Sequence, residues 1–310
     1  MRFSITGHLG SGKSTICKLL SNEYNFDIVS AGSIMREEAS RKGVSVLEFQ
    51  KNPKYFTDGI DNYIDNAIVE KNKLIPEEKN VIFDSRLAWH FLPETFKIFI
   101  IVSPYEAALR TYLTRNEKEE KYSSIEEAMD KLIDRRVTEN RRYKAIYNVN
   151  CEDLENYDVV VDTTFISPNE AVEIIMDCYN KKIRNEHYER LWISPQFLLP
   201  TGKLEYIDHE KIKHYCDLID SNEPIEPIKI LRVHDSLFVV EGHSRLIAYN
   251  LRKIKLINPK IVYDEDDLLS DGRKAKRMIS VTENDVREWE KINGFKYNYM
   301  PRIVKKNDIK

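Results

Sequence analysis

The stretch GHLGSGKST, residues 7–15, decides the fold of the first half of this chain. It matches the pattern GxxxxGK followed by Ser or Thr, and it comes directly after a short apolar run at residues 3–6. A glycine loop between a strand and a helix lets backbone N–H groups converge on a phosphate at the helix N-terminus. The stretch therefore predicts a phosphate loop that holds a nucleoside triphosphate.

The positions of this loop have distinct expected roles. The Lys13 ammonium is expected to reach the β- and γ-phosphates, and the Ser14 hydroxyl is expected to hold Mg²⁺. ATP and Mg²⁺ are therefore the expected cofactors, and a P-loop kinase is the expected enzyme. The predicted ATP-binding residues of the loop are Gly7, His8, Leu9, Gly10, Ser11, Gly12, Lys13, Ser14 and Thr15.

Short apolar runs alternate with helical patterns through the first 180 residues, and residues 168–182 form a closing amphipathic pattern. Strands with helices between them are typical of a parallel sheet that is covered on both faces. The sequence thus predicts an α/β fold with a doubly wound, five-stranded parallel sheet over residues 1–186. The apolar runs lie at residues 3–6, 26–29, 81–83, 98–102 and 159–161.

The pattern changes in the polar stretch at residues 185–190. Beyond it, two β-rich runs at 228–233 and 237–240 predict a hairpin. We therefore expect a second, smaller α+β domain over residues 187–310, with a helical extension at its C-terminal end. Its other expected elements are helices at 208–221 and 243–253 and a strand at 259–263.

The composition gives no general attraction to nucleic acid, because 48 basic and 51 acidic residues leave a net charge of −3. The four cysteines are far apart and form no CxxC pair, which argues against a metal site and a disulfide scaffold. No apolar run approaches ~18 residues, and the early glycine loop leaves no room for a signal peptide. We expect a cytoplasmic protein with no membrane partner, in the host cytoplasm if the chain is phage-encoded. Basic residues gather only at Arg273, Lys274, Lys276, Arg277, Arg302, Lys305, Lys306 and Lys310.

Three further stretches resemble the cytidylate kinase family, especially its short archaeal-type branch. They are SAGSIMREEASRKGVSVLEF at 30–49, VIFDSRLAWHF at 81–91 and RRVTENRRYKAIYNVN at 135–150. With the phosphate loop, they cover nearly all of residues 1–179 in the order and spacing of that family. The resemblance implies a pyrimidine nucleotide as the acceptor of the phosphoryl group.

The resemblance also assigns roles to individual side chains. It implies a mobile lid at residues 124–147, and it implies that Arg110 and Arg115 lie beside the donor nucleotide. Guanidinium forks suit an acceptor phosphate and the charge of the transition state. Surface ion pairs on the lid helix are the alternative interpretation of its Arg and Glu residues. The implied acceptor-binding residues are Ser30, Arg36, Arg86, Arg135, Glu139 and Arg142, of which Arg135 and Arg142 are also candidate catalytic residues.

The sequence departs from that family at two positions on the acceptor side. Ser85 stands where the family usually has glycine, and Ser33 stands where the archaeal-type branch has an acidic residue. These departures suggest an acceptor other than plain CMP. Asp84 follows the apolar run at 81–83 and is expected at the carboxyl edge of the sheet, where ligands bind. It is a candidate catalytic base if the acceptor is a hydroxyl.

Residues 192–263 resemble the ParB/sulfiredoxin fold, most clearly in VVEGHSRLIAYN at 239–250. In that fold a G-x-x-R turn at the start of a helix binds phosphate, which implies substrate-binding roles for Gly242, His243 and Arg245. Sulfiredoxins need a cysteine where this chain has His243, so thiol redox chemistry is not expected. The alternative interpretation makes Gly242 a turn glycine and Arg245 a surface residue.

Three functions remain open from the sequence. The first is a free CMP or dCMP kinase with an accessory domain, and the third is a nucleotide-gated, DNA-binding regulator. The second resembles the phage 5-hydroxymethyluracil DNA kinases, which phosphorylate the hydroxymethyl group of a modified pyrimidine within DNA as a step toward hypermodified thymidines. We favour the second at this stage, because it gives roles to Asp84, to Ser85 and to the extra domain. The oligomeric state is not predicted.

Overall fold

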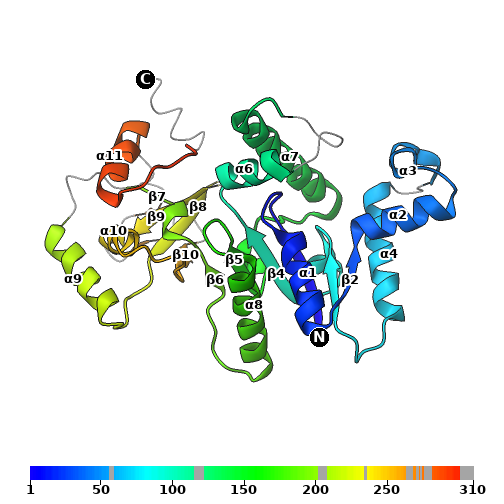
Figure 1. Cartoon of the computed structure of the whole chain (residues 1–310), viewed down its shortest axis with the longest axis horizontal. Helices are drawn as coiled ribbons and strands as arrows, with labels where there is room; N and C mark the ends of the chain where they lie inside the picture. The colour runs from blue at the N-terminus through cyan, green and yellow to red at the C-terminus, as the bar shows by residue number, and fades with distance from the viewer. Residues whose placement is uncertain are drawn as a thin grey trace. The chain divides into compact units, whose positions relative to one another are not determined.

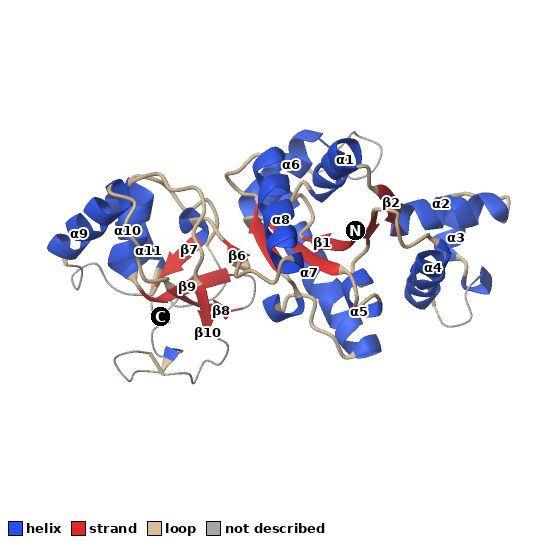
Figure 2. Cartoon of the chain, turned by 90° about the horizontal axis from the view of Figure 1, so that it is seen from below, coloured by secondary structure: helices blue, strands red, loops and turns tan. Residues whose placement is uncertain are grey.

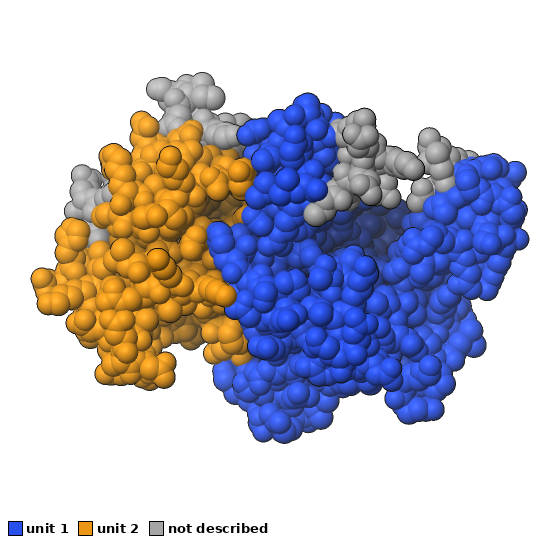
Figure 3. Space-filling view, in the orientation of Figure 1, with its two compact units in different colours: residues 1–102, 106–188 blue, residues 103–105, 189–310 orange. Residues whose placement is uncertain are grey.

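The computed structural model describes residues 1–55, 59–114, 122–201, 208–233, 236–262, 268–269, 272, 274–275 and 281–300. These residues form two compact units, which Figure 3 colours separately. The division falls between Tyr188 and Glu189, and residues 103–105 are grouped with the second unit. None of the helices in the described ranges is both long enough and apolar enough to cross a membrane.

The first unit is built on an α/β sheet in which its five strands lie in the order β2-β3-β1-β4-β5. The five predicted strands are confirmed, and their pairings β2–β3, β3–β1, β1–β4 and β4–β5 are all parallel. The predicted five-stranded sheet over residues 1–186 is therefore confirmed, and the short strand β6 lies beyond it in the sequence, in the second unit. A two-residue strand leaves no alternating pattern to detect in the sequence. The strands are β1 (Arg2–Gly7), β2 (Asp27–Ser30), β3 (Val81–Asp84), β4 (Phe96–Ile101), β5 (Val159–Asp162) and β6 (Leu191–Trp192).

Helices connect these strands and cover the sheet. Helices α1 and α8 pack against each other over the sheet (Figure 1). In Figure 2, α2, α3 and α4 gather beyond β2, away from the other helices of this unit. The bounds are α1 (Lys13–Tyr24), α2 (Ala31–Arg41), α3 (Val46–Lys51), α4 (Ile60–Leu74), α5 (Ala88–Phe91), α6 (Pro104–Thr114), α7 (Ile125–Tyr147) and α8 (Pro168–Ile183).

Strand β4 lies in the interior of the sheet, between β1 and β5, and shows why both faces of the sheet are covered. Its side chains alternate between the two faces, and almost all of them are buried. Phe96 packs edge-on against Tyr179 of α8, with ring centroids 5.4 Å apart. Phe99 points to the other face and stacks on Tyr157, which contacts Trp89 of α5. An apolar strand without polar alternation is therefore what this position requires.

The second unit contains a four-stranded sheet with the order β10-β8-β9-β7. The predicted hairpin is confirmed, since β8 and β9 pair antiparallel, while β7 pairs with β9 and β10 with β8 in parallel. Helix α9 packs on α10, and α11 contacts α10 and β7. The elements are β7 (Leu198–Pro200), α9 (His209–Asp220), β8 (Lys229–Val233), β9 (Ser236–Glu241), α10 (His243–Leu251), β10 (Lys260–Val262) and α11 (Glu283–Asn293).

Candidate functional site

The phosphate loop joins β1 to α1, and its backbone requires glycine. Gly10 and Gly12 have φ values of 77° and 79°, in the left-handed region that L side chains rarely adopt. A Cβ atom on Gly10 would stand 2.6 Å from the carbonyl oxygen of Ala107, which is backbone and has no rotamer to change. The loop therefore tolerates no larger residue at this position without displacing α6.

Polar groups of this loop lack the partners that a helix start normally has. The N-cap residue of α1 is Gly12, which has no side chain to accept from the first N–H groups of the helix. The Ser11 hydroxyl is buried without a hydrogen-bond partner among the described residues, while its carbonyl oxygen accepts from Thr163 Oγ1 at 2.8 Å. Unsatisfied groups at a helix N-terminus suit a phosphate. The loop thus fits ATP, and Ser14, the second residue of α1, would hold Mg²⁺.

Lys13 and Asp84 form an ion pair beside this loop. Asp84 is the last residue of β3, and its Cα pairs with Ile5 of β1, two residues before the loop begins. The two side chains are 21% and 16% exposed. The contact with Asp84 holds the Lys13 ammonium beside the phosphate loop. Asp84 would then face the donor phosphates.

Arg86 connects the phosphate loop with α7. Its guanidinium donates to the carbonyl oxygen of Gly7, and its Nε lies 3.2 Å from Glu139 Oε2. Glu139 also accepts from Arg135 Nε at 2.9 Å, one helical turn earlier on α7. The structure thus brings together Arg86, Arg135 and Glu139. Arg135 is 47% exposed, which matches the surface ion pair of the alternative interpretation.

Arg142 lies apart from this cluster and joins α7 to α4. Its Nε is 3.0 Å from Asp61 Oδ2, and its guanidinium lies over the ring of Tyr143, 5.2 Å from the centroid. Asp61 was not a predicted site residue. An acceptor phosphate bound by Arg142 would have to compete with the Asp61 carboxylate.

The last residue of α7, Tyr147, is held between α4 and α5. Its hydroxyl donates to Asp65 Oδ2 at 2.9 Å and lies 2.6 Å from Asn62 Oδ1. Its ring packs edge-on against Phe91, with centroids 5.2 Å apart. Burial raises the pKa of the Asp65 carboxyl to about 6; Asp61 adds to the increase, and the hydrogen bond from Tyr147 opposes it.

The Asp65→Asn variant is expected to be more stable than the wild type at pH 8. The pKa of Asp65 in the folded chain, about 6, exceeds the ordinary value of 3.8 for an aspartate, so the folded state holds the proton more tightly. The contribution of this group to stability therefore falls as the pH rises from about 4 to 6, by at most about 3 kcal/mol. Removing the charge should raise Tm at pH 8 and leave it unchanged near pH 4.

Thermal unfolding of both proteins between pH 4 and pH 8 measures this difference. The exposed Asp130 of α7 gives the control, because Asp130→Asn should not reproduce the gain in Tm at pH 8. A stability gain for Asp65→Asn that is independent of pH would contradict the assignment.

Ser33 and Ser85, the two departures from the family pattern, have local structural roles. Ser33 and Ser30 cap α2 reciprocally, with Ser33 N donating to Ser30 Oγ at 2.9 Å and Ser30 N donating to Ser33 Oγ at 3.0 Å. Ser85 is buried, its hydroxyl accepts from Leu87 N at 3.5 Å, and its φ is not positive. These roles weaken the sequence argument that the acceptor differs from CMP.

Arg36 and Arg110, the other two implied contact residues in the described ranges, lie in separate places. Arg36 on α2 is exposed and forms no ion pair with a described residue. Arg110 on α6 donates to the carbonyl oxygen of Thr163 at 2.7 Å and pairs with Glu106 at 2.9 Å. It therefore holds the segment that follows β5. Arg115 lies outside the described residues.

In the second unit, Gly242 is the left-handed N-cap of α10, with a φ of 106°. His243 Nε2 accepts from Thr201 N at 3.2 Å. Arg245 is buried, and its guanidinium donates to the carbonyl oxygens of Glu226 and Pro227 at 2.6 and 3.0 Å. The alternative interpretation of Arg245 as a surface residue was therefore wrong, because these carbonyl groups draw it inward. Phosphate binding by this turn stays a prediction. Of the basic residues near the chain end, Arg273, Lys276, Arg277, Arg302, Lys305, Lys306 and Lys310 lie outside the described residues.

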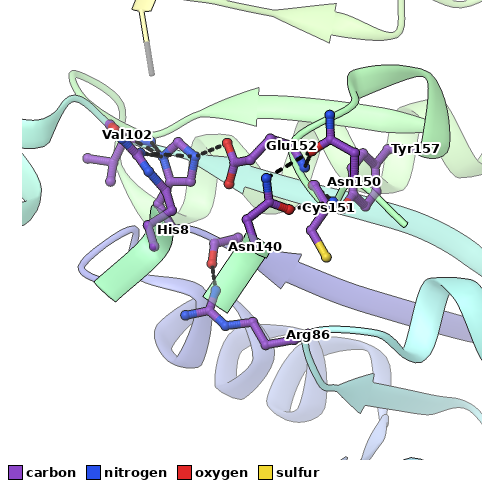
Figure 4. Close-up of polar contacts among 10 residues, drawn as sticks. His8, Arg86, Val102, Asn140, Asn150, Cys151, Glu152 and Tyr157 are labelled. Atoms are coloured by element: carbon purple, nitrogen blue, oxygen red, sulfur yellow. Dashed lines mark hydrogen bonds and ion pairs between the residues drawn. The ribbon is translucent and has the colours of Figure 1, made fainter. Parts of the chain in front are cut away.

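Sequence reasoning missed a cluster around the second residue of the phosphate loop. The His8 side chain is buried, and Figure 4 shows it pointing toward Glu152. Its Nε2 lies 3.3 Å from Glu152 Oε2, and Arg136 NH1 lies 3.3 Å from its Nδ1. Glu152 stands in a loop with no periodic pattern, and Arg136 is adjacent in sequence to Arg135, which the family resemblance selected. Only the fold shows that these residues meet.

Residues 3–165 match the model of the cytidylate kinase-like family. The chain is 35% identical over 179 residues to a cytidylate kinase from Pyrobaculum arsenaticum, covering 56% of this chain and 90% of that protein. It is 30% identical over 198 residues to a cytidylate kinase from Thermoplasma volcanium, covering 61% and 96%. A shikimate kinase structure from Bacteroides thetaiotaomicron aligns at 15% identity over 60% of this chain and 98% of that chain, with a TM-score of 0.41. The family match ends within the first unit.

Proposed function

On the premise that the chain belongs to the cytidylate kinase-like family, we propose that it phosphorylates a free pyrimidine nucleoside monophosphate, CMP or dCMP. It is a P-loop kinase that uses ATP and Mg²⁺. An oxygen of the acceptor phosphate would attack the γ-phosphorus, the bond to the bridging oxygen would break, and ADP and a nucleoside diphosphate would leave. Bound Mg²⁺ supplies positive charge to the phosphates during this transfer.

The position of Arg86 is the observation that carries this proposal. Its guanidinium is in contact with the backbone of the phosphate loop at Gly7 and, through Glu139, with α7. A fixed positive fork next to the donor site is what a phosphate acceptor needs, because both reacting groups are anionic. The capping roles of Ser30 and Ser33 also agree with an ordinary nucleotide acceptor.

A hydroxymethyl pyrimidine within DNA, such as 5-hydroxymethyluracil, is the second candidate acceptor. The observation that favours it is the unit from Glu189 onward, which the family match at residues 3–165 does not reach. Asp84 stands at the end of β3 beside Lys13, where a carboxylate can take the proton of a hydroxyl. A regulator that only hydrolyses ATP needs no acceptor arginines, so we do not propose one.

Transfer of label from [γ-³²P]ATP decides between these acceptors. The full chain is incubated with CMP, with dCMP, and with DNA that contains or lacks 5-hydroxymethylpyrimidines. We expect labelled CDP or dCDP and no label in either polymer. Label in hydroxymethylated DNA, with none in CMP or dCMP, would overturn the proposal in favour of the second candidate.

Replacing Asp84 with asparagine provides an independent comparison. For a phosphate acceptor no base is needed, so kcat should fall by about tenfold or less, through weaker orientation of the donor phosphates. For a hydroxyl acceptor, loss of a general base costs about 10²–10⁴ in kcat. Steady-state kinetics of Asp84→Asn with each acceptor that receives label gives this number. The exposed Asp27, paired with Lys79, is the matched control, since Asp27→Asn should change neither kcat nor KM.

A further inference from the structure

Helix α7 carries two adjacent polar stripes. Arg135, Glu139 and Arg142 follow the i, i+4, i+7 spacing of one stripe, which contacts Arg86 and Asp61. The next stripe begins one residue later, about 100° around the helix. It consists of Arg136 and Asn140, and it contacts the phosphate loop and the segment that follows α7. One helix therefore touches the acceptor-side residues with one stripe and the donor loop with the other.

The contact with the donor loop is made at the His8 imidazole. Arg136 NH1 lies 3.3 Å from Nδ1 and 3.4 Å from Nε2 of that ring. Val102 N donates to Nδ1 at 3.4 Å, and Nε2 lies 3.3 Å from Glu152 Oε2. Nδ1 also lies 3.3 Å from the carbonyl oxygen of Val102. Phe99 packs edge-on against the ring, with centroids 5.4 Å apart.

Glu152 is held at this ring by the segment that follows α7. Asn150 Oδ1 accepts from the Glu152 backbone N–H at 3.1 Å and from Asn140 Nδ2 at 3.1 Å. Asn140 Oδ1 in turn accepts from Cys151 N at 3.1 Å. Figure 4 shows these side chains converging between α7 and His8. The second stripe thus reaches His8 twice, directly through Arg136 and indirectly through Asn140 and Glu152.

We propose that Arg136, in contact with the His8 ring, is a positioning residue that couples the donor site to the acceptor site. Phosphates in the loop fix the backbone at His8, and the His8 ring then fixes Arg136 and the helix that bears it. The same helix carries Arg135, Glu139 and Arg142, so their positions become set before the acceptor arrives. Donor binding should therefore tighten acceptor binding, and the acceptor should tighten donor binding by the same factor.

Equilibrium binding measures this coupling directly. The Kd of the nucleotide that accepts label in the transfer assay is determined with and without a non-hydrolysable ATP analogue and Mg²⁺. In the wild type we expect the analogue to tighten acceptor binding about tenfold, within the usual range of coupling between sites. In Arg136→Ala and in His8→Ala, the ratio of the acceptor Kd without the analogue to the Kd with it should fall toward one. The double variant should lose no more than either single variant, because both changes break one connection.

Arg141→Ala is the matched control, since Arg141 is an exposed arginine on the same helix. It should retain the coupling factor of the wild type. The proposal would be overturned if Arg136→Ala kept the coupling factor of the wild type, or if Arg141→Ala lost as much of it as Arg136→Ala does. Additive losses of coupling in the double variant would also overturn it. If Arg136→Ala does not fold, Arg136→Lys replaces it and should show an intermediate factor.

The choice of acceptor in this experiment rests on the proposed function, but the two can fail separately. If the wild type labels no nucleotide or DNA, the proposed function is wrong. The contact between Arg136 and His8 is then tested at the donor site alone, through the affinity for the ATP analogue. Arg136→Ala should weaken that affinity severalfold and Arg141→Ala should not, and equal affinities in the two variants would overturn the inference.

Discussion

Lys13→Ala is expected to lower kcat by about a thousandfold with any acceptor. Lys13 is the first residue of α1 and the charged member of the phosphate loop, and it forms an ion pair with Asp84. During transfer its ammonium would neutralise charge on the β- and γ-phosphates. Removing one preorganised donor to developing charge costs about 10²–10³ in kcat, and losing a full positive charge at the phosphoryl group costs about 10³–10⁵.

The measurement is ADP release in a coupled assay at saturating ATP and acceptor. Lys18→Ala supplies the control, because Lys18 is an exposed lysine of the same helix and should leave kcat unchanged. The rate of label transfer by Lys13→Ala should fall to the same extent with either kind of acceptor. A decrease of less than tenfold for Lys13→Ala would show that the loop does not hold the transferring phosphoryl group.

Arg86→Ala is expected to lower kcat/KM for the acceptor by about 10²-fold or more. The variant removes the guanidinium that joins Gly7 of the phosphate loop to Glu139 of α7. It also leaves the half-buried Glu139 paired with Arg135 of its own helix. Because Arg86 is assigned to the acceptor, the KM for ATP should change far less than the KM for the nucleotide.

Initial rates over a grid of ATP and acceptor concentrations separate these effects. Arg86→Lys should recover only part of the loss, since an ammonium cannot present the planar fork. Arg41→Ala is the control, because Arg41 is an exposed arginine paired with Glu37 and Glu38 on α2. An increase in the KM for ATP with unchanged acceptor kinetics would contradict the assignment of Arg86.

The sequence was a good guide to the first unit wherever a residue acts through its own backbone neighbourhood. The phosphate loop could be predicted because Gly10 and Gly12 need a backbone that only glycine adopts readily. The strands at β1, β3, β4 and β5 are buried and apolar, so they appear as runs in the sequence. Strand β6 has only two residues, and so short a strand has no pattern from which it could be predicted.

Contacts between distant parts of the chain could not be predicted in this way. His8 and Glu152 are 144 positions apart, and Asp61 meets Arg142 across 81. Nothing in the composition of either segment indicates its partner, because surface carboxylates and arginines are common and only the fold selects among them. The same holds for Arg245 in the second unit, whose buried position depends on the carbonyl groups of Glu226 and Pro227.

Helix α7 is attached at its Tyr147 end, so a rotation about that end would displace its residues in proportion to their distance from it. It has 23 residues, which at a rise of 1.5 Å each is a length of about 34 Å. If the Tyr147 hydroxyl between Asn62 and Asp65 stays in place, a rotation of α7 by about 10° about that end displaces its other end by about 6 Å. Arg142 lies one and a half turns from Tyr147 and is displaced little. Arg136 lies near the middle of the helix and is displaced half as far as the end at Ile125. Under the proposed coupling, the contact of Arg136 with His8 would therefore limit how far the whole helix moves.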